Sequence, residues 1–354
     1  MIAILLAPLP GLVIYLLNAR LLRAIDEPSF DERLWRHRRR YAQLAGVSVI
    51  LLGVFAWRWT PLTLPILSFS CWAGIYPMQR RAFAEERTLG EYLLACARLA
   101  FGVTLFWVVV TFEPLIVGTV GIDNWGWVLG ALIFWLFIYR SQLLWALHAE
   151  PMADERFQAI AEKVGLSPTV YRFGSPKSSF INAFALPDSK RPSVLTSRAM
   201  LRHLDADEAS AIFAHEVAHL EMSTAARKRM AGRIFMAVII IGAILPSLLN
   251  DALFAEIVWL VAISIGTLLR RSRRQQRETQ CDLRAIELCG DPQALIRALT
   301  KTHRLGRIPA RWDRRYAKRA THPSLEQRVA DITSRISHTS PGSADSGLAH
   351  SPAS

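Results

Sequence analysis

Cysteine and charged residues are both scarce in this sequence. Only 4 of its 354 residues are cysteine, and Asp, Glu, Lys and Arg together make up 20%. Cys71 and Cys96 fall within long apolar runs, so the chain lacks the disulfide framework that stabilises small secreted domains. Hydrophobic residues amount to 52%, and 11 are tryptophan. This composition excludes an ordinary soluble domain and favours an integral membrane protein.

Seven long runs of the chain carry almost no charge. Most of them approach the roughly 20 residues that a helix needs to cross a bilayer. They span residues 2–17, 41–57, 62–78, 92–112, 125–147, 234–249 and 252–269. We expect the first run to be a retained anchor, because it has neither a basic leader nor a small-residue cleavage site. The last two form a hairpin, which Pro246 would allow to enter the bilayer without crossing it.

Arginines are concentrated at alternate ends of these runs. Clusters follow the first and third runs and flank the late hairpin on both sides, whereas the other connections have almost no basic residues. Because basic residues stay on the cytoplasmic side, we expect the amino terminus outside and the region after residue 150 in the cytoplasm. Membrane anchoring also explains the net charge of +13 better than nucleic acid does. A further basic run, 304–319, either rests on anionic lipid headgroups or is a solvated loop.

A zinc-binding motif lies in the second half of the chain. His215, Glu216, Val217, Ala218 and His219 spell H-E-x-x-H, which on a helix places both imidazoles on one face, one turn apart. Two neutral imidazoles supply half of a tetrahedral zinc site, and Glu216 is placed to take a proton from water at the metal. The implied chemistry is hydrolysis. The alternative is a pair of histidines packed against a core, with no metal.

The surrounding pattern predicts that this motif is helical. Asp205, with Glu208 three residues later, is typical of a helix start. The apolar residues after it recur at helical spacing and form one stripe. They are Ile212, Phe213, Val217 and Leu220.

A third ligand is expected from the first polar helix after the apolar hairpin. Glu278 and Asp282 are four residues apart there and share a helix face. Glu278 completes a two-His, one-Glu zinc site with one position open to water, and Asp282 accepts the free N–H of a liganding imidazole. The alternative is an exposed, charged surface helix. For Cys281, beside Glu278, we expect a small buried residue with no chemical role.

Together these motifs resemble a known family. His215-Glu216-x-x-His219, followed after a membrane hairpin by Glu278-x-x-x-Asp282, is similar to the HtpX and CAAX prenyl protease group of integral membrane zinc metallopeptidases. Residues 180–187 resemble the family's Asn-Ala-Phe-Ala strand, 194–197 the strand before the zinc helix, and 321–328 its Thr-His-Pro-x-x-x-x-Arg segment. The resemblance covers about 151–335. Two departures are the missing Asp shortly after the second histidine, within 220–224, and the larger number of early apolar runs.

The resemblance implies a fold and one Zn²⁺ per chain. The fold is mainly α and multi-pass, with a zincin-like α+β catalytic domain whose small sheet lies beside the H-E-x-x-H helix and which a transmembrane hairpin interrupts. In the resemblance the His-Pro segment lies near the metal, so His322 is a candidate donor to the oxyanion and Arg328 pairs with a carboxylate. The residue pattern itself predicts a short helix at 155–164, followed by extended runs at 170–173, 180–186 and 193–196. The extended runs would form the small sheet. Asn182 either binds the substrate backbone at an edge strand or is an ordinary strand residue.

These expectations divide the chain into five parts. Residues 1–150 form a transmembrane region, 151–230 and 271–336 the two halves of the metallopeptidase domain, 231–270 the hairpin, and 337–354 a disordered tail. We expect an endopeptidase at the cytoplasmic face of a bacterial inner membrane, acting on polypeptides, mainly membrane proteins, in quality control, with the lipid bilayer but no nucleic acid as partner. The alternatives are a narrow processing or sensor-transducer protease, and a catalytically silent zinc-stabilised scaffold. The oligomeric state stays open.

Overall fold

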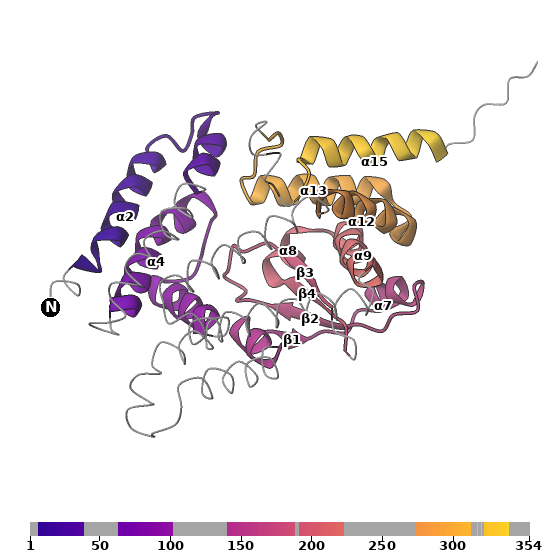
Figure 1. Ribbon diagram of the computed structural model, residues 1–354, viewed down its shortest axis with the longest axis horizontal. Coiled ribbons are helices and arrows are strands. Elements are labelled where there is room, and N and C mark those ends of the chain that lie inside the picture. The colour runs from indigo at the N-terminus through magenta and orange to yellow at the C-terminus, as the bar shows by residue number, and fades with distance from the viewer. Residues whose placement is uncertain are drawn as a thin grey trace, which may run out of the picture.

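The computed structural model describes residues 6–38, 63–101, 140–187, 191–222, 274–312, 317, 320 and 322–339. Figure 1 shows the N-terminal helices on one side, a small sheet in the middle, and the C-terminal helices beside the sheet. The predicted apolar runs 41–57, 234–249 and 252–269, and most of 92–112 and 125–147, lie outside the described residues. None of the described helices is both long enough and apolar enough to cross a bilayer. The number of spans therefore stays a prediction.

The first and third apolar runs correspond to two packed helices, α2 (Leu9–Leu22) and α4 (Thr63–Ala82). Their backbones approach closely because glycines face the contact. A Cβ atom on Gly11 would lie 2.2 Å from the carbonyl oxygen of Ser70, and one on Gly74 would lie 2.3 Å from that of Gly11. Buried Asn18 donates a 2.9 Å hydrogen bond to the carbonyl of Gly74. Small residues and a buried amide hold this pair together, as at helix contacts in membranes.

The sheet has four short strands in the order β1-β2-β4-β3. These are β1 (Glu150–Pro151), β2 (Thr169–Phe173), β3 (Ala183–Leu186) and β4 (Ser193–Ser197). β2 and β4 are parallel, while β1 and β3 pair antiparallel to their neighbours. β4 is central and all its residues are buried. β3 is an edge strand, as the sequence predicted, although it begins three residues later than the expected run at 180; the two-residue β1 was not predicted.

Helix α9 (Ala206–Met222) carries H-E-x-x-H through the centre of the domain. It contacts β3, β4 and three other helices. The ring of Phe213 stacks on that of Phe157 at 4.3 Å between centroids. The other helices of the domain are α7 (Glu155–Glu162), α8 (Arg198–His203), α12 (Arg274–Cys289), α13 (Pro292–Leu305) and α15 (Leu325–Thr339). This helix-rich fold with a small mixed sheet confirms the predicted class of the catalytic domain. Helix α15 extends three residues into the predicted tail, the rest of which lies outside the described residues.

The start of α9 is held by a reciprocal cap. The carboxylate of Asp205 accepts hydrogen bonds from the backbone N–H of Asp207 and Glu208, at 3.1 Å and 2.9 Å. Glu208 in turn accepts from the backbone N–H of Asp205 at 3.0 Å. It is fully buried and also bonds Lys301 of α13 at 2.7 Å. The predicted helix start is confirmed, and the cap also ties α9 to a neighbouring helix.

Candidate metal centre

Two histidines of α9 point to the same place. The Nε2 atoms of His215 and His219 are 3.2 Å apart. Their side chains are 8% and 22% exposed, so both rings lie largely inside the domain. The four-residue spacing produces this arrangement, because side chains one turn apart stack along one face.

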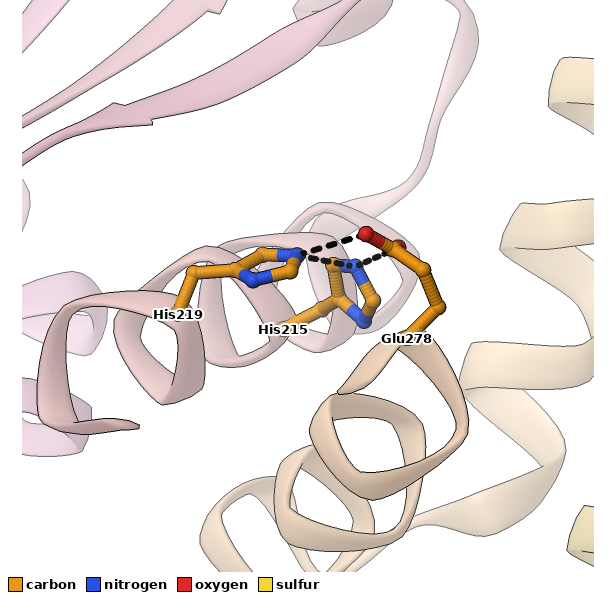
Figure 2. A group of neighbouring side chains, drawn as sticks. All are labelled: His215, His219 and Glu278. Carbon is orange, nitrogen blue, oxygen red and sulfur yellow. Dashed lines mark hydrogen bonds and ion pairs between the residues drawn. The ribbon is translucent and has the colours of Figure 1, made fainter. Parts of the chain in front are cut away.

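Helix α12 supplies the third group. Figure 2 shows the Glu278 carboxylate reaching toward both rings from the neighbouring helix. Its Oε2 lies 3.5 Å from Nε2 of His215, and its Oε1 lies 3.6 Å from Nε2 of His219. Packing of α12 against α9 brings together residues that are more than fifty positions apart in the chain.

These atoms fit the ligand set of a zinc ion. Ligand atoms about 2.0–2.1 Å from a tetrahedral zinc lie about 3.3 Å from one another. The observed separations of 3.2, 3.5 and 3.6 Å are close to this spacing. In addition, Oε2 of Glu278 is buried, and its 2.8 Å contact with Nδ1 of His322 is poorly aligned for a hydrogen bond, so this oxygen keeps a lone pair for a metal. His215, His219 and Glu278 could therefore hold the ion together.

The electrostatics of the centre also favour a cation. Burial opposes the charge of Glu278, but contacts with His215, His219 and His322 outweigh it and hold the pKa of the carboxyl well below its usual range. Burial likewise lowers the pKa of His215, while Asp282 and Glu278 together raise it to about 9. The acidic groups thus hold positive charge at this point, as a cation site requires.

A buried acid and base lie behind His215. Oδ1 of Asp282 is 2.8 Å from Nδ1 of His215, a close contact whose alignment is poor for a hydrogen bond. From α15, Arg328 donates to both oxygens of Asp282, at 2.7 Å and 2.5 Å. Burial raises the pKa of Asp282, but Arg328 and His215 outweigh it and lower the value. Three helices therefore position one imidazole, with Asp282 and Arg328 where the sequence predicted outer partners.

His322 also reaches the centre. Its Nδ1 lies 2.8 Å from Oε2 of Glu278, although its side chain is 56% exposed. Solvent access on one side and a ligand on the other suit a group that meets substrate.

Two further predicted residues lie nearby. Glu216 follows His215 on α9 and is 8% exposed. Asn182 is exposed and lies immediately before β3, which packs against α9. The backbone of Asn182 is held by Ser197: its N–H donates to Oγ at 3.0 Å, and its carbonyl accepts from the Ser197 N–H at 2.9 Å. The described hydrogen bonds of Asn182 thus involve only its backbone, which pairs with the last residue of β4.

Cys281 makes a contact at the centre that the sequence analysis did not predict. It is fully buried, as predicted, but its Sγ lies 3.2 Å from Nδ1 of His219. Burial raises the pKa of this thiol, so the sulfur stays uncharged. Because Nε2 of His219 faces the candidate metal position, the proton of the neutral ring belongs on Nδ1, and Sγ can accept a hydrogen bond from it. Helical spacing offered a signal: positions three and four after Glu278 share its face, so Cys281 and Asp282 can each meet one histidine.

Comparison with known proteins agrees with this geometry. The family model of peptidase family M48 matches residues 148–336. A protease HtpX homolog of Methanopyrus kandleri is 28% identical over 156 residues, covering 42% of this chain and 49% of the relative. Another, from Methylibium petroleiphilum, is 27% identical over 183 residues, covering 44% and 65%. The chain thus spans about half to two thirds of the length of these curated relatives.

A solved structure shows the same fold over almost the whole chain. The crystal structure of S. mikatae Ste24p aligns with a TM-score of 0.55 at 13% identity, covering 93% of this chain and 99% of that one. The resemblance inferred from the motifs is therefore confirmed. Because the family model matches more than half of the chain and includes all three candidate ligands, the chain belongs to peptidase family M48, the family of zinc metallopeptidases that includes HtpX.

Proposed function

We propose that this protein is a membrane-bound, zinc-dependent endopeptidase that hydrolyses peptide bonds at the cytoplasmic face of its membrane. The observation that carries the proposal is the set of three ligand atoms from His215, His219 and Glu278, with Glu216 beside them. Bound there, zinc would supply an activated water and would polarise the carbonyl of the scissile bond.

The chain's own residues would move the protons and orient the groups. Glu216 takes a proton from the attacking water and passes it to the leaving amine. His322, half exposed beside Glu278, donates a hydrogen bond to the developing oxyanion. Asp282, held by Arg328, keeps the ring of His215 in one orientation.

The edge strand β3 is the proposed binding site for the substrate backbone. It pairs with β4 along one edge only among the described strands, so its other edge could accept an extended peptide. Asn182, exposed immediately before β3, would bind that peptide through its side-chain amide. The packing of β3 against α9 would bring the bound segment toward the metal.

The proposed membrane location is supported by the N-terminal helices and the apolar runs. Leu9, Leu12, Val13 and Leu16 are between 48% and 58% exposed on α2, an apolar surface that lipid would cover. Residues 1–150 would anchor the enzyme and 231–270 would enter the bilayer as a hairpin between the two halves of the domain. Alternation of the arginine clusters supports a cytoplasmic site in a bacterial inner membrane.

Anchor and proposed active site lie in one chain, which supports membrane proteins as substrates and quality control as the role. Comparative membrane proteomics of cells that carry the wild type or E216Q would test this. Accumulation of many unrelated membrane proteins in the variant is expected. Accumulation of a single protein would instead indicate a narrow processing protease.

The peptidase activity itself is tested with purified protein and casein. E216Q should keep its zinc but lose cleavage, because the amide cannot take a proton. The matched control is E221Q, which changes an exposed glutamate of the same helix that pairs with Arg284, and it should cleave normally. Cleavage by E216Q would refute the role of Glu216, while a wild type that binds zinc but digests no casein would indicate a silent scaffold.

A further inference from the structure

A second site lies away from the metal centre, between the N-terminal helices and the catalytic domain. It is a cavity of about 860 Å³. Its walls come from α4, the helical segment 89–101, the end of β2 with the loop after it, and the end of α13. None of the three candidate zinc ligands is among the described residues that line it.

Four arginines line this cavity, and two of them have a carboxylate partner. Arg87 pairs with Glu85 at 2.7 Å, and Arg198 pairs with Glu150 at 2.6 Å. Glu85 therefore balances the charge of Arg87, whereas Arg198 shares Glu150 with Arg172 outside the cavity.

The other two arginines, Arg38 and Arg98, have no acidic partner in the described part of the chain. Arg38 donates to the carbonyl of Gly306 at 3.3 Å and lies over the ring of Phe83, 4.3 Å from its centroid. Arg98 donates to the carbonyl of Trp145 at 3.0 Å, and its Nε is buried without a hydrogen-bond partner. Burial also lowers the pKa of Arg38. Two partly desolvated positive charges in one cavity favour an anionic ligand.

The remaining wall of the cavity is largely apolar and continues onto the surface. Phe83, Leu94, Leu99 and Phe180 are among the lining residues. Leu94 and Leu99 are 63% and 42% exposed. A ligand that satisfies both parts of the cavity has an anionic group and an apolar body.

We propose that this cavity binds an anionic phospholipid, whose phosphate interacts with Arg38 and Arg98 and whose acyl chains lie along Leu94 and Leu99. The proposal rests on the membrane location given under the proposed function. The cavity is lined by residues within 92–99, where one predicted membrane run begins, and by 146–147, where another ends. The phosphate of a lipid at the end of these apolar runs would face the guanidinium groups of Arg38 and Arg98, which can bind it through paired hydrogen bonds.

Binding by the purified full-length protein in detergent tests the proposal without any need for cleavage. The probes are phosphatidylglycerol, phosphatidylcholine with the same acyl chains, and inorganic phosphate, and native mass spectrometry measures occupancy. The wild type should prefer phosphatidylglycerol over phosphatidylcholine by about tenfold, the effect of roughly one charge-assisted contact. R38Q/R98Q should lose the preference, and R38K/R98K, which keeps the charges, should retain most of it.

The matched control is R36Q/R80Q, which removes two arginines that do not line the cavity: Arg36 pairs with Glu32, and Arg80 bonds Tyr76. This control should bind like the wild type. A preference that survives in R38Q/R98Q, or that falls equally in the control, would overturn the proposal. Full displacement of the lipid by inorganic phosphate, or by a peptide that ends in a free carboxylate, would also overturn it.

A second variant covers the case in which R38Q/R98Q does not fold: loss of the preference by R38K/R98K would then count against the site. If the purified protein binds the lipid selectively but neither binds zinc nor cleaves peptides, the lipid site stands and the proposed peptidase function fails.

Discussion

Oδ1 of Asp282 lies 2.8 Å from Nδ1 of His215, on the side of the ring opposite to the nitrogen that faces Glu278. Each nitrogen of this ring therefore meets a carboxylate from the same helix. Asp282 is 1% exposed and is held in turn by Arg328. The arrangement keeps His215 oriented for the metal and increases its basicity.

D282N should weaken zinc binding by about 10- to 100-fold, the usual cost of removing such an outer partner. The amide keeps the size of the carboxylate and one acceptor for Arg328, so the fold should persist. Competition with a fluorescent chelator measures the affinity, and circular dichroism checks folding. E287Q, which changes an exposed glutamate on the same helix, serves as control. Wild-type affinity in D282N would mean that Asp282 does not position the ring.

Cys281 should matter for zinc binding through its contact with His219. C281V keeps the size of the side chain but removes the hydrogen-bond acceptor, so it should bind zinc several-fold more weakly, while C281S should bind more tightly than C281V. The same chelator competition measures both variants. C289S, at the end of α12, is the control and should bind zinc normally. Equal affinities of C281V and C281S would indicate that Cys281 only fills space.

The three candidate ligands could be predicted to lie together because each of the two motifs that carry them is local in sequence. H-E-x-x-H lies on one helix, whose start is marked in the sequence by the capping residues Asp205 and Glu208. Glu278 and Asp282 lie on another helix. The contact of Cys281 with His219 was not predicted because it depends on how α12 docks on α9, which periodicity does not show. Strand β1 was missed for a similar reason: its two residues form a strand only because they pair with β2. The membrane spans stay predictions, because most of the apolar runs lie outside the described residues.

The stability of the protein should fall in mild acid because of His303 on α13. Burial, together with the charges of Arg328 and His322, lowers the pKa of His303 to about 4, against an ordinary value of 6.5. The unfolded chain therefore binds a proton below pH 6.5 that the folded protein excludes until about pH 4. Stability is full above pH 6.5 and is lost as the pH falls through this window.

His303 should lower the free energy of unfolding by about 2 kcal/mol between pH 7 and pH 5. H303Q stays neutral and should lose less stability over the same range. Thermal unfolding of both proteins at several pH values measures the difference, with chelator present so that zinc release does not contribute. Parallel pH profiles would show that His303 is not the group responsible.

The contact between α2 and α4 should tolerate no side chain at Gly74. A Cβ there would lie 2.3 Å from the carbonyl oxygen of Gly11, so G74A should force the helices apart and destabilise the protein by about 1–3 kcal/mol. Gly90 is the matched control, because nothing lies within 4 Å of its Cβ position. Since alanine favours a helix over glycine, G90A should be neutral or stabilising. Melting in detergent compares the two, and equal melting temperatures would mean that the close helix contact does not stabilise the protein.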